Sequence, residues 1–577
     1  MPLDFRNINT LWASVLAETC YRLGLTTAIA CPGSRSAPLT VAFAQHPHLE
    51  TLSILDERSA AFFALGVAKQ TGQPVVLICT SGTAGANFYP AVIEAALSHV
   101  PLIILTADRP PELRHCHAGQ TINQIRLYGD YPNWQTELAL PQWDLLDYLR
   151  QTLVQAWRRS HFPQQGVVHL NLPFREPLAP VTDPDLLPLG EQWDEAAFFG
   201  EIRPPVSPPL APVSYPSPWE KGTKGLIIGG LAQPREPKLY CQAIAQLAQT
   251  LQFPVLAEGL SPLRNYAPLN PHLITTYDTL LRHPHWGDQL VPDLVIQIGE
   301  LPTSKVLRQW LTQHQPPRWI VDPHPENFDP LHHPAHPLPC TVEQLQHPDF
   351  PRPPSPYLHQ WQTLNQQVNR QLNATLDPLE TLFEGKLTWL LSQTLPPHTP
   401  IFISNSTPVR DVEYFWQPND QGYQPFFNRG ANGIDGIVST ALGIAHGNRP
   451  TVLVTGDLAL LHDTNGLLQQ GKLRGHLTII AIANNGGGIF EFLPIAQYDP
   501  PFTDYFATPQ NVNLQQLASA YGIPCHPLTH WQQLPPLLNP LPPSGVRLLL
   551  LPTQRQSDAH YRKMLFSQVL STSVNCE

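Results

Sequence analysis

Asp457 and Asn484 carry oxygen atoms that suit a divalent cation, and each stands where a probable buried strand ends. The runs 451–455 and 477–483 are apolar or β-branched, and the stretch 464–474 between them has a helical pattern. This order predicts a βαβ unit whose two strands end at one edge of a parallel sheet. A carboxylate, an amide oxygen and the backbone carbonyl of Gly486 suit Mg²⁺, or Mn²⁺, and leave positions for phosphate oxygens and water. We therefore predict a metal and diphosphate site at Asp457, Asn484 and Gly486.

The glycine-rich turn after the second of these strands has two interpretations. Residues 484–488 read NNGGG, and such a turn lets the backbone approach a phosphate group closely. An ordinary loop after a strand has the same composition, so the turn alone does not decide between them.

A second candidate carboxylate, Glu57, lies in the first third of the chain. The segment 56–66 (DERSAAFFALG) follows a probable strand at 52–55 and opens a probable helix. An acidic residue in a first helical turn is common on any helix, because the helix dipole favours it. Two further units follow, with the polar loops 80–87 (TSGTAGAN) and 105–110 (LTADRP) after the strands 74–79 and 101–105. Three successive units thus present polar loops at one sheet edge.

Five basic residues are candidates for binding an anionic substrate. The chain has a formal net charge of −11, so attraction of an anion needs a local basic cluster. We expect all five in loops that follow strands, and arginine forks bind carboxylates through two hydrogen bonds. A surface salt bridge remains the alternative for any one of them. The five are Arg35, Arg109, Lys305, Arg410 and Arg429.

The combination of these motifs resembles the thiamine-diphosphate-dependent enzymes. The segments Gly456-Asp457-Leu458 and Asn484-Asn485 resemble the GDG…NN signature of that family, with Leu458 where many members have glycine. The segments 31–39 (CPGSRSAPL), 56–58 (DER), 405–410 (NSTPVR) and 428–436 (NRGANGIDG) resemble the branch that serves menaquinone and phylloquinone biosynthesis. The resemblance extends from residue 31 to about residue 494. It implies an α/β fold of three doubly wound parallel-sheet domains.

The implied domains are a pyrimidine-binding domain at 1–185, a central α/β domain at 200–350 and a diphosphate-binding domain at 375–577. The length and the 42% hydrophobic content agree with about three cores. Proline-rich stretches at 203–218 and 351–356 are typical of stiff linkers between domains.

The resemblance also implies an activity and its residues. The reaction is decarboxylation of 2-oxoglutarate and 1,4-addition of the resulting succinyl unit to isochorismate, with thiamine diphosphate as cofactor. Glu57 would activate the cofactor, and Gln120 and Ser406 would guide proton movement. Cofactor contacts are implied for Glu57, Ser81, Gly82, Asn87, Ile434, Asp457, Leu458, Asn484, Gly486, Ile489 and Phe490. Substrate contacts are implied for Ser34, Arg35, Arg109, Gln120, Lys305, Asn405, Ser406, Arg410, Arg429, Phe490 and Leu493.

Some of these assignments have rivals. The apolar members Ile434, Ile489, Phe490 and Leu493 suit ordinary core packing equally well. Gly119 replaces an asparagine that is frequent in relatives, and Val306 replaces a second basic residue, so substrate and effector contacts near them stay open. Acetohydroxyacid synthases and 2-oxo acid decarboxylases share the scaffold without this set of arginines. A catalytically silent thiamine-binding protein is the alternative outside enzymes.

The composition of the chain limits the classes of binding partner and the cellular compartment that we expect. Eight cysteines show no CxxC spacing, which favours free thiols in a reducing compartment, and we expect a cytoplasmic protein. The acidic balance argues against nucleic acid, and the lack of 18 consecutive apolar residues argues against stable membrane insertion. The resemblance implies a homodimer or tetramer with active sites at subunit interfaces.

Overall fold

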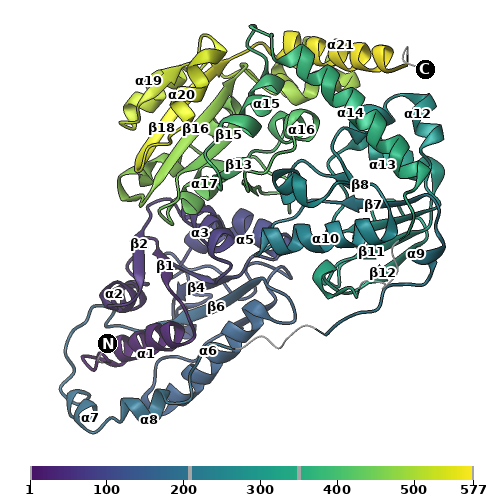
Figure 1. The fold of residues 1–577 in the computed structure, drawn as a ribbon. Coiled ribbons are helices and arrows are strands. Elements are labelled where there is room, and N and C mark those ends of the chain that lie inside the picture. The colour runs from purple at the N-terminus through teal and green to yellow at the C-terminus, as the bar shows by residue number, and fades with distance from the viewer. Residues whose placement is uncertain (1–2, 206–210, 347–351, 575–577) are drawn as a thin grey trace. The chain divides into compact units, whose positions relative to one another are not determined.

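The computed structural model describes residues 3–205, 211–346 and 352–574, so parts of both predicted linkers, 206–210 and 351, lie outside the described residues. The described chain contains three six-stranded sheets in which every strand pair is parallel (Figure 1). The prediction of three parallel-sheet α/β domains is confirmed.

The first sheet has the strand order β2-β1-β3-β4-β6-β5. Strands β3, β4 and β6 are buried along their whole length, as expected where helices cover both faces. The strand predicted at 52–55 begins and ends two residues earlier, as β2. The strands are β1 (Thr27–Ala30), β2 (Glu50–Ser53), β3 (Val75–Cys79), β4 (Leu102–Asp108), β5 (Trp134–Glu137) and β6 (Val167–Pro173). The main helices are α1 (Ile8–Arg22), α2 (Ala37–Gln45), α3 (Glu57–Thr71), α5 (Tyr89–Leu97) and α6 (Leu146–His161).

The second sheet has the strand order β12-β11-β10-β7-β8-β9. Its strands β7, β8 and β10 are buried along their whole length and consist mostly of apolar residues. The strands are β7 (Gly225–Gly229), β8 (Val255–Ala257), β9 (Leu273–Ile274), β10 (Leu294–Ile298), β11 (Arg318–Val321) and β12 (Ala335–Leu338). Helices α10 (Pro237–Leu251) and α13 (Lys305–His314) belong to this region.

The third sheet has the strand order β14-β13-β15-β16-β18-β17 and contains the predicted βαβ unit. Strands β15 (Thr451–Gly456) and β16 (His476–Ala483) are parallel neighbours, with Thr455 opposite Ala481. Helix α18 (Asp457–His462) and the 3₁₀ helix η5 (Thr464–Lys472) connect them. The other strands are β13 (Pro400–Ile403), β14 (Gln424–Phe426), β17 (Cys525–Pro527) and β18 (Gly545–Pro552). The main helices are α14 (Pro356–Leu376), α15 (Glu384–Thr394), α16 (Thr407–Phe415), α17 (Ile437–Ala445) and α21 (Arg555–Val574).

The chain forms two compact units that are not contiguous in sequence. Unit 1 contains the described residues before the first gap together with Asn428–Arg449 and Leu461–Gly475, and unit 2 contains the rest. Within unit 1, helix α17 crosses α3 at two glycines. A Cβ atom on Gly66 would lie 2.0 Å from the Thr440 carbonyl oxygen, and one on Gly443 would lie 2.1 Å from that of Phe63. Only glycine therefore permits this close crossing.

Among the described residues, we find no helix that has both the length and the apolar character needed to cross a lipid bilayer.

Candidate active site

The predicted site residues divide between the two units. Unit 1 carries Ser34, Arg35, Glu57, Ser81, Gly82, Asn87, Arg109, Gln120, Arg429 and Ile434. Unit 2 carries Lys305, Asn405, Ser406, Arg410, Asp457, Leu458, Asn484, Gly486, Ile489, Phe490 and Leu493.

The structure brings the three predicted metal ligands together in unit 2. Asp457 follows β15 directly, and its Oδ1 and Oδ2 accept hydrogen bonds from the N–H groups of Leu458 (2.7 Å) and Gly486 (3.1 Å). Burial raises the pKa of this carboxyl, and the charge of Glu384 raises it further. Gly486 has φ +134°, and a Cβ atom there would lie 2.3 Å from the Ala507 carbonyl oxygen. This turn therefore requires glycine.

Asn484 has a side-chain oxygen suited to a cation. Its Nδ2 donates a hydrogen bond to Glu384 Oε1 at 2.6 Å. Its Oδ1 is buried and has no hydrogen-bond partner among the residues that the structure describes, and the whole residue is only 6% exposed. A buried acceptor without a partner is costly, and a bound cation would satisfy it. The carboxylate of Asp457, this oxygen and the Gly486 carbonyl thus fit Mg²⁺.

A buried ionic cluster lies behind Asn484. Arg562 donates from Nε and Nη2 to the two Asp411 oxygens at 2.9 and 2.8 Å, and its Nη2 lies 3.5 Å from Glu384 Oε2. Asp558 Oδ2 accepts the Glu384 N–H at 3.0 Å. Burial raises the pKa of Asp411, and burial with the charge of Glu384 raises that of Asp558 to about 7.

We expect the substitution Asp558→Asn to stabilise the protein at pH 8. The folded-state pKa of about 7 lies above the ordinary 3.8, so the folded state binds the extra proton between these values. The unfolding free energy therefore falls as the pH rises through this window. Asparagine can still accept the Glu384 N–H and carries no charge, so we expect a melting temperature about 2–4 °C higher at pH 8, and a smaller gain at pH 5.

Thermal unfolding followed by circular dichroism at both pH values measures this effect. The exposed Asp420 provides the matched control, because Asp420→Asn removes one charge without changing a buried group. Equal destabilisation of Asp558→Asn at pH 5 and pH 8 would contradict the assignment of the raised pKa to this carboxyl.

Two of the five basic residues lie in helices rather than in loops. Lys305 is the first residue of α13, because Ser304 Oγ accepts the Leu307 N–H at 3.0 Å and starts the helix there. Arg410 lies inside α16, which begins after β13 and a short turn. The prediction of loops was wrong for both, because each helix begins soon after its strand and already includes the basic residue. Arg35, Arg109 and Arg429 lie outside helices, as predicted.

Ser406 and Arg410 are in contact. The Arg410 guanidinium donates to the Ser406 carbonyl oxygen, and burial lowers the pKa of Arg410. Ser406 has φ 76° and ψ −129°, a conformation that is strained for any residue except glycine. Asn405, which precedes it, is buried. Strain of this kind is concentrated at functional sites.

We expect Ser406→Gly to separate stability from activity. The strained conformation costs about 1–3 kcal/mol, and glycine would relieve it. Part of this gain is offset because glycine loses more conformational entropy on folding, so we expect the unfolding free energy to rise by about 1 kcal/mol. Loss of the hydroxyl should lower kcat/KM by about tenfold, the worth of one hydrogen bond. Urea unfolding and steady-state kinetics measure the two effects. A variant that is both less stable and fully active would contradict this role.

In unit 1, Glu57 is the first residue of α3, as predicted. Asp56 caps the helix by accepting the Ser59 N–H at 3.0 Å. Burial raises the pKa of the Glu57 carboxyl, and the neighbouring Asp56 charge raises it further. Asn465 donates to Asp56 Oδ2 at 2.7 Å, so the segment Leu461–Gly475 holds the start of α3.

Two predicted arginines of unit 1 meet beside the loop after β3. Arg35 is buried and donates to the Phe174 carbonyl oxygen at 3.0 Å, while Arg109 donates to the Ser81 hydroxyl. Burial lowers the pKa of Arg35, and the nearby Arg109 charge lowers it further. Arg35 also lies 3.4 Å from Glu176 Oε1, which offsets part of its charge, and the remaining positive charge beside this loop suits a bound anion.

Gln120 and Gly82 lie beside the same loop. Gln120 Nε2 donates to the Ser81 carbonyl oxygen at 2.9 Å, and a Cβ atom on Gly82 would lie 2.8 Å from Gln120 Cγ. The structure therefore groups Ser81, Gly82, Arg109 and Gln120. Ser34 is exposed in the turn before α2. Asn87 is exposed at the end of the short helix α4 (Ala84–Asn87) and donates to the Thr83 carbonyl oxygen at 3.3 Å.

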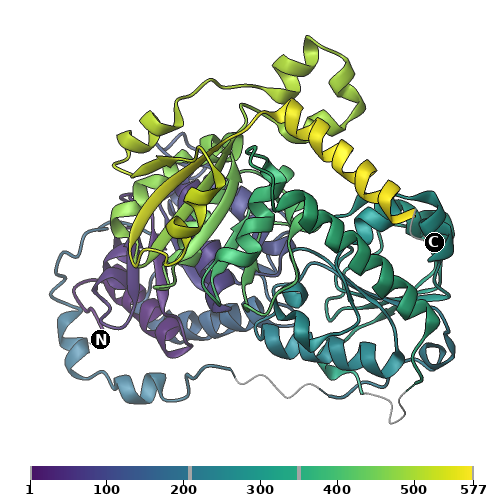
Figure 2. The ribbon, with the colours of Figure 1, turned by 45° about the horizontal axis from the view of Figure 1, so that its top comes forward.

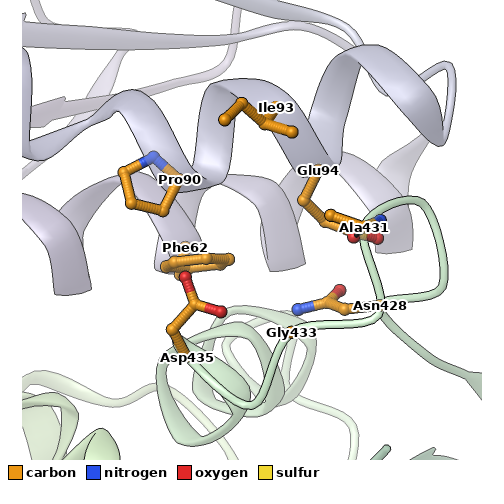
Figure 3. Close-up of a pocket in the computed structure, with 8 residues that line it drawn as sticks. All are labelled: Phe62, Pro90, Ile93, Glu94, Asn428, Ala431, Gly433 and Asp435. Carbon is orange, nitrogen blue, oxygen red and sulfur yellow. Dashed lines mark hydrogen bonds between the residues drawn. The ribbon is translucent and has the colours of Figure 1, made fainter.

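The predicted loop 428–436 borders a cavity of about 180 Å³ in unit 1 (Figure 3). Phe62 from α3 and Pro90, Ile93 and Glu94 from α5 line one side, and Asn428, Ala431, Gly433 and Asp435 line the other. Glu94 accepts the N–H groups of Gly430 and Ala431 at 3.0 and 2.7 Å. The loop that carries Arg429 and Ile434 is thus fixed to α5.

The apolar residues after the glycine turn differ in exposure. Ile489 and Phe490 lie in the 3₁₀ helix η6 (Gly488–Phe492) and are half-buried, whereas Leu493 is exposed. Their proposed contacts with cofactor or substrate stay predictions.

Sequence reasoning missed three buried polar residues that shape these loops. Glu94, Glu384 and Gln124 hold site segments by hydrogen bonds, and Gln124 Oε1 accepts the Gly82 N–H at 3.0 Å. Glu384 is an acidic residue in the first turn of α15, and many helices have such a residue, so the sequence offered no reason to connect it with the site.

Two known families match parts of the chain. The family "Thiamine pyrophosphate enzyme, N-terminal TPP binding domain" matches residues 12–127, and the family "Middle domain of thiamine pyrophosphate" matches residues 217–403. Solved structures agree on the fold. Benzoylformate decarboxylase from Polynucleobacter necessarius superposes with a TM-score of 0.68 at 18% identity, covering 94% of this chain and 98% of that one.

Curated relatives match nearly the full chain. The protein named 2-succinyl-5-enolpyruvyl-6-hydroxy-3-cyclohexene-1-carboxylate synthase in Gloeothece citriformis is 58% identical, covering 98% of this chain and 99% of the relative. The protein of the same name in Trichormus variabilis is 57% identical over 100% of both chains. The chain therefore belongs to the 2-succinyl-5-enolpyruvyl-6-hydroxy-3-cyclohexene-1-carboxylate synthase family of thiamine pyrophosphate enzymes.

Proposed function

We propose that the protein decarboxylates 2-oxoglutarate and adds the resulting succinyl unit to isochorismate, as a step of menaquinone or phylloquinone biosynthesis. The observation that carries this proposal is the identity of 54–58% over nearly the whole chain to relatives that bear the synthase name. When bound, thiamine diphosphate supplies the nucleophilic carbon and the electron sink that decarboxylation requires.

The residues of this chain would supply binding and orientation. Asp457, Asn484 and Gly486 would hold Mg²⁺, or Mn²⁺, against the diphosphate. This assignment is supported by the buried, unpartnered oxygen of Asn484. Glu57 would hydrogen-bond the pyrimidine ring, in keeping with its half-buried position and raised pKa.

The substrates are both dicarboxylates, and arginine is the residue best suited to them. Arg35 and Arg109 lie together in unit 1, and Arg410 contacts Ser406 in unit 2. Each guanidinium can bind a carboxylate through two parallel hydrogen bonds. We assign carboxylate binding to these three arginines together with Arg429 and Lys305, and proton guidance to Gln120 and Ser406.

We further propose a homodimer or tetramer with active sites between subunits, because Glu57 and Asp457 lie in different units of the chain. A cytoplasmic location is favoured by the seven cysteines within the described residues, which are free thiols.

A coupled incubation tests the reaction. Purified protein is supplied with thiamine diphosphate, Mg²⁺, 2-oxoglutarate and isochorismate, and isochorismate loss and product mass are followed. We expect consumption only when all four are present. Release of CO₂ without loss of isochorismate would identify a simple decarboxylase, and cofactor binding without either change would identify a silent binding protein.

A further inference from the structure

We propose that Glu384 is a positioning residue that fixes the side-chain amide of Asn484, so that Oδ1 and not Nδ2 faces the cation. The proposal rests on the metal site of the proposed function and adds to it a residue outside the ligand set. It also assigns to the C-terminal helix α21 the task of holding Glu384 in place.

The hydrogen bond between Glu384 and Asn484 fixes the orientation of the Asn484 amide. Glu384 Oε1 accepts from Asn484 Nδ2 at 2.6 Å, so the amide nitrogen is the Asn484 group that faces Glu384. The opposite side of the amide is then the oxygen, which is the atom left unpartnered and buried. An amide with the reverse orientation would place Nδ2 toward the cation, which it cannot ligate. Glu384 thereby selects the orientation that can bind metal.

Helix α21 anchors Glu384 through two residues. Asp558 accepts the backbone N–H of Glu384 at 3.0 Å, and Arg562 lies 3.5 Å from its Oε2. Arg562 is itself fixed by two hydrogen bonds to Asp411 of α16. All four side chains are buried, so each depends on the others for its partners.

The same face of α21 also holds the turn after Asn484. Arg555 donates from Nε to Glu491 Oε1 at 2.8 Å and from Nη1 to the Asn485 carbonyl oxygen at 3.0 Å. Residues 555, 558 and 562 are spaced three and four apart and so lie along one side of the helix. In Figure 2, α21 is the yellow helix that begins beside the segment following β16. One helix therefore supports the metal-ligand turn at two points.

A purely structural role for Glu384, as a counter-ion of Arg562, is the competing explanation. The two roles differ for the variant Glu384→Gln. Glutamine has nearly the same shape but can donate as well as accept, so it allows Asn484 to turn its oxygen away from the cation. Outer-shell substitutions of this kind typically weaken metal binding by about 10–100-fold.

Binding of Mn²⁺ in the presence of thiamine diphosphate, followed by electron paramagnetic resonance of the free ion, measures the effect without turnover. We expect Glu384→Gln to weaken Mn²⁺ binding by about 10–100-fold. The exposed Glu380, four residues away, gives the matched control, and Glu380→Gln should bind as the parent does.

Testing Glu384→Gln in a second variant, Asn484→Asp, separates a role in orienting the amide from a purely structural role. In the Asn484→Asp background the side chain presents an oxygen in either orientation, so the selection by Glu384 is no longer needed. Glu384→Gln can donate a hydrogen bond to the introduced carboxylate, so we expect it to leave the Mn²⁺ affinity unchanged in this background.

A structural role would lower the affinity in both backgrounds. The pair of comparisons remains informative even if Glu384→Gln alone is unstable, because each comparison is made within one background.

Three outcomes overturn the proposal. Equal Mn²⁺ affinities of the parent and Glu384→Gln would remove the orientation role, and so would a loss of affinity in both backgrounds. If thiamine diphosphate fails to promote Mn²⁺ binding to the parent, the cofactor site of the proposed function fails as well, and the two failures are thereby distinguished.

Discussion

The substitution Glu57→Gln is expected to lower kcat by about 10²–10⁴-fold, the usual contribution of a positioned acid–base group. Glu57 would lose its charge and its ability to exchange a proton, while the start of α3 stays capped by Asp56. The metal ligands belong to the other unit, so Mn²⁺ binding with thiamine diphosphate should change by less than about tenfold. Single-turnover decarboxylation of 2-oxoglutarate measures the loss.

The chain offers a closely matched control for this change. Glu195 is the first residue of helix α8 (Glu195–Phe199), and Asp194 caps that helix as Asp56 caps α3. Glu195→Gln therefore repeats the substitution at the same helical position, far along the sequence from every predicted site residue. We expect parental activity for it. Full activity of Glu57→Gln would refute the catalytic role of Glu57.

The substitution Asp457→Asn is expected to weaken Mn²⁺ binding by at least about 100-fold, because even changes outside the ligand set cost about 10–100-fold. Asparagine has nearly the same size as aspartate, so the loss of Mn²⁺ affinity measures the contribution of the negative charge. Burial raises the pKa of Asp457, so a proton competes with the metal at higher pH than at an exposed aspartate. The affinity of the parent should therefore fall as the pH is lowered, and this dependence should flatten in the variant.

Titrations of Mn²⁺ at several pH values measure this prediction. Asp504 is exposed and lies in the same unit, so Asp504→Asn is a suitable control. Metal binding by Asp457→Asn that equals the parent at all pH values would remove Asp457 from the ligand set.

The sequence predicted the parts of the site that depend on strand ends. The strands before Asp457 and Asn484 are buried runs of mostly apolar or β-branched residues, and the polar residues that follow such strands in a parallel sheet come to one edge. For the same reason, the loop with Ser81 and Gly82 and the loop with Arg109 were predicted at one edge. Local pattern and topology suffice for residues of this kind.

The supporting residues could not be predicted in this way. Glu384, Asp411 and Arg562 come from three helices, and Arg562 bonds to the other two across 178 and 151 positions of sequence. A single sequence does not reveal that charged residues at helix surfaces are buried against one another. The starts of helices were also predicted poorly from the sequence, because the Ser304 cap begins α13 earlier than the strand pattern alone indicates.

The crossing of α3 and α17 has a consequence for biosynthesis. The chain passes between its two units five times, and the segments that complete unit 1 end only at Gly475 of 577 residues. A ribosome releases the first sheet and α3 long before it has made α17. The face of α3 around Gly66, which packs against α17 in the folded protein, therefore stays uncovered during most of translation. A fragment that ends near residue 205 would expose this face permanently. We expect such a fragment to aggregate, and nascent chains of this length to be clients of chaperones.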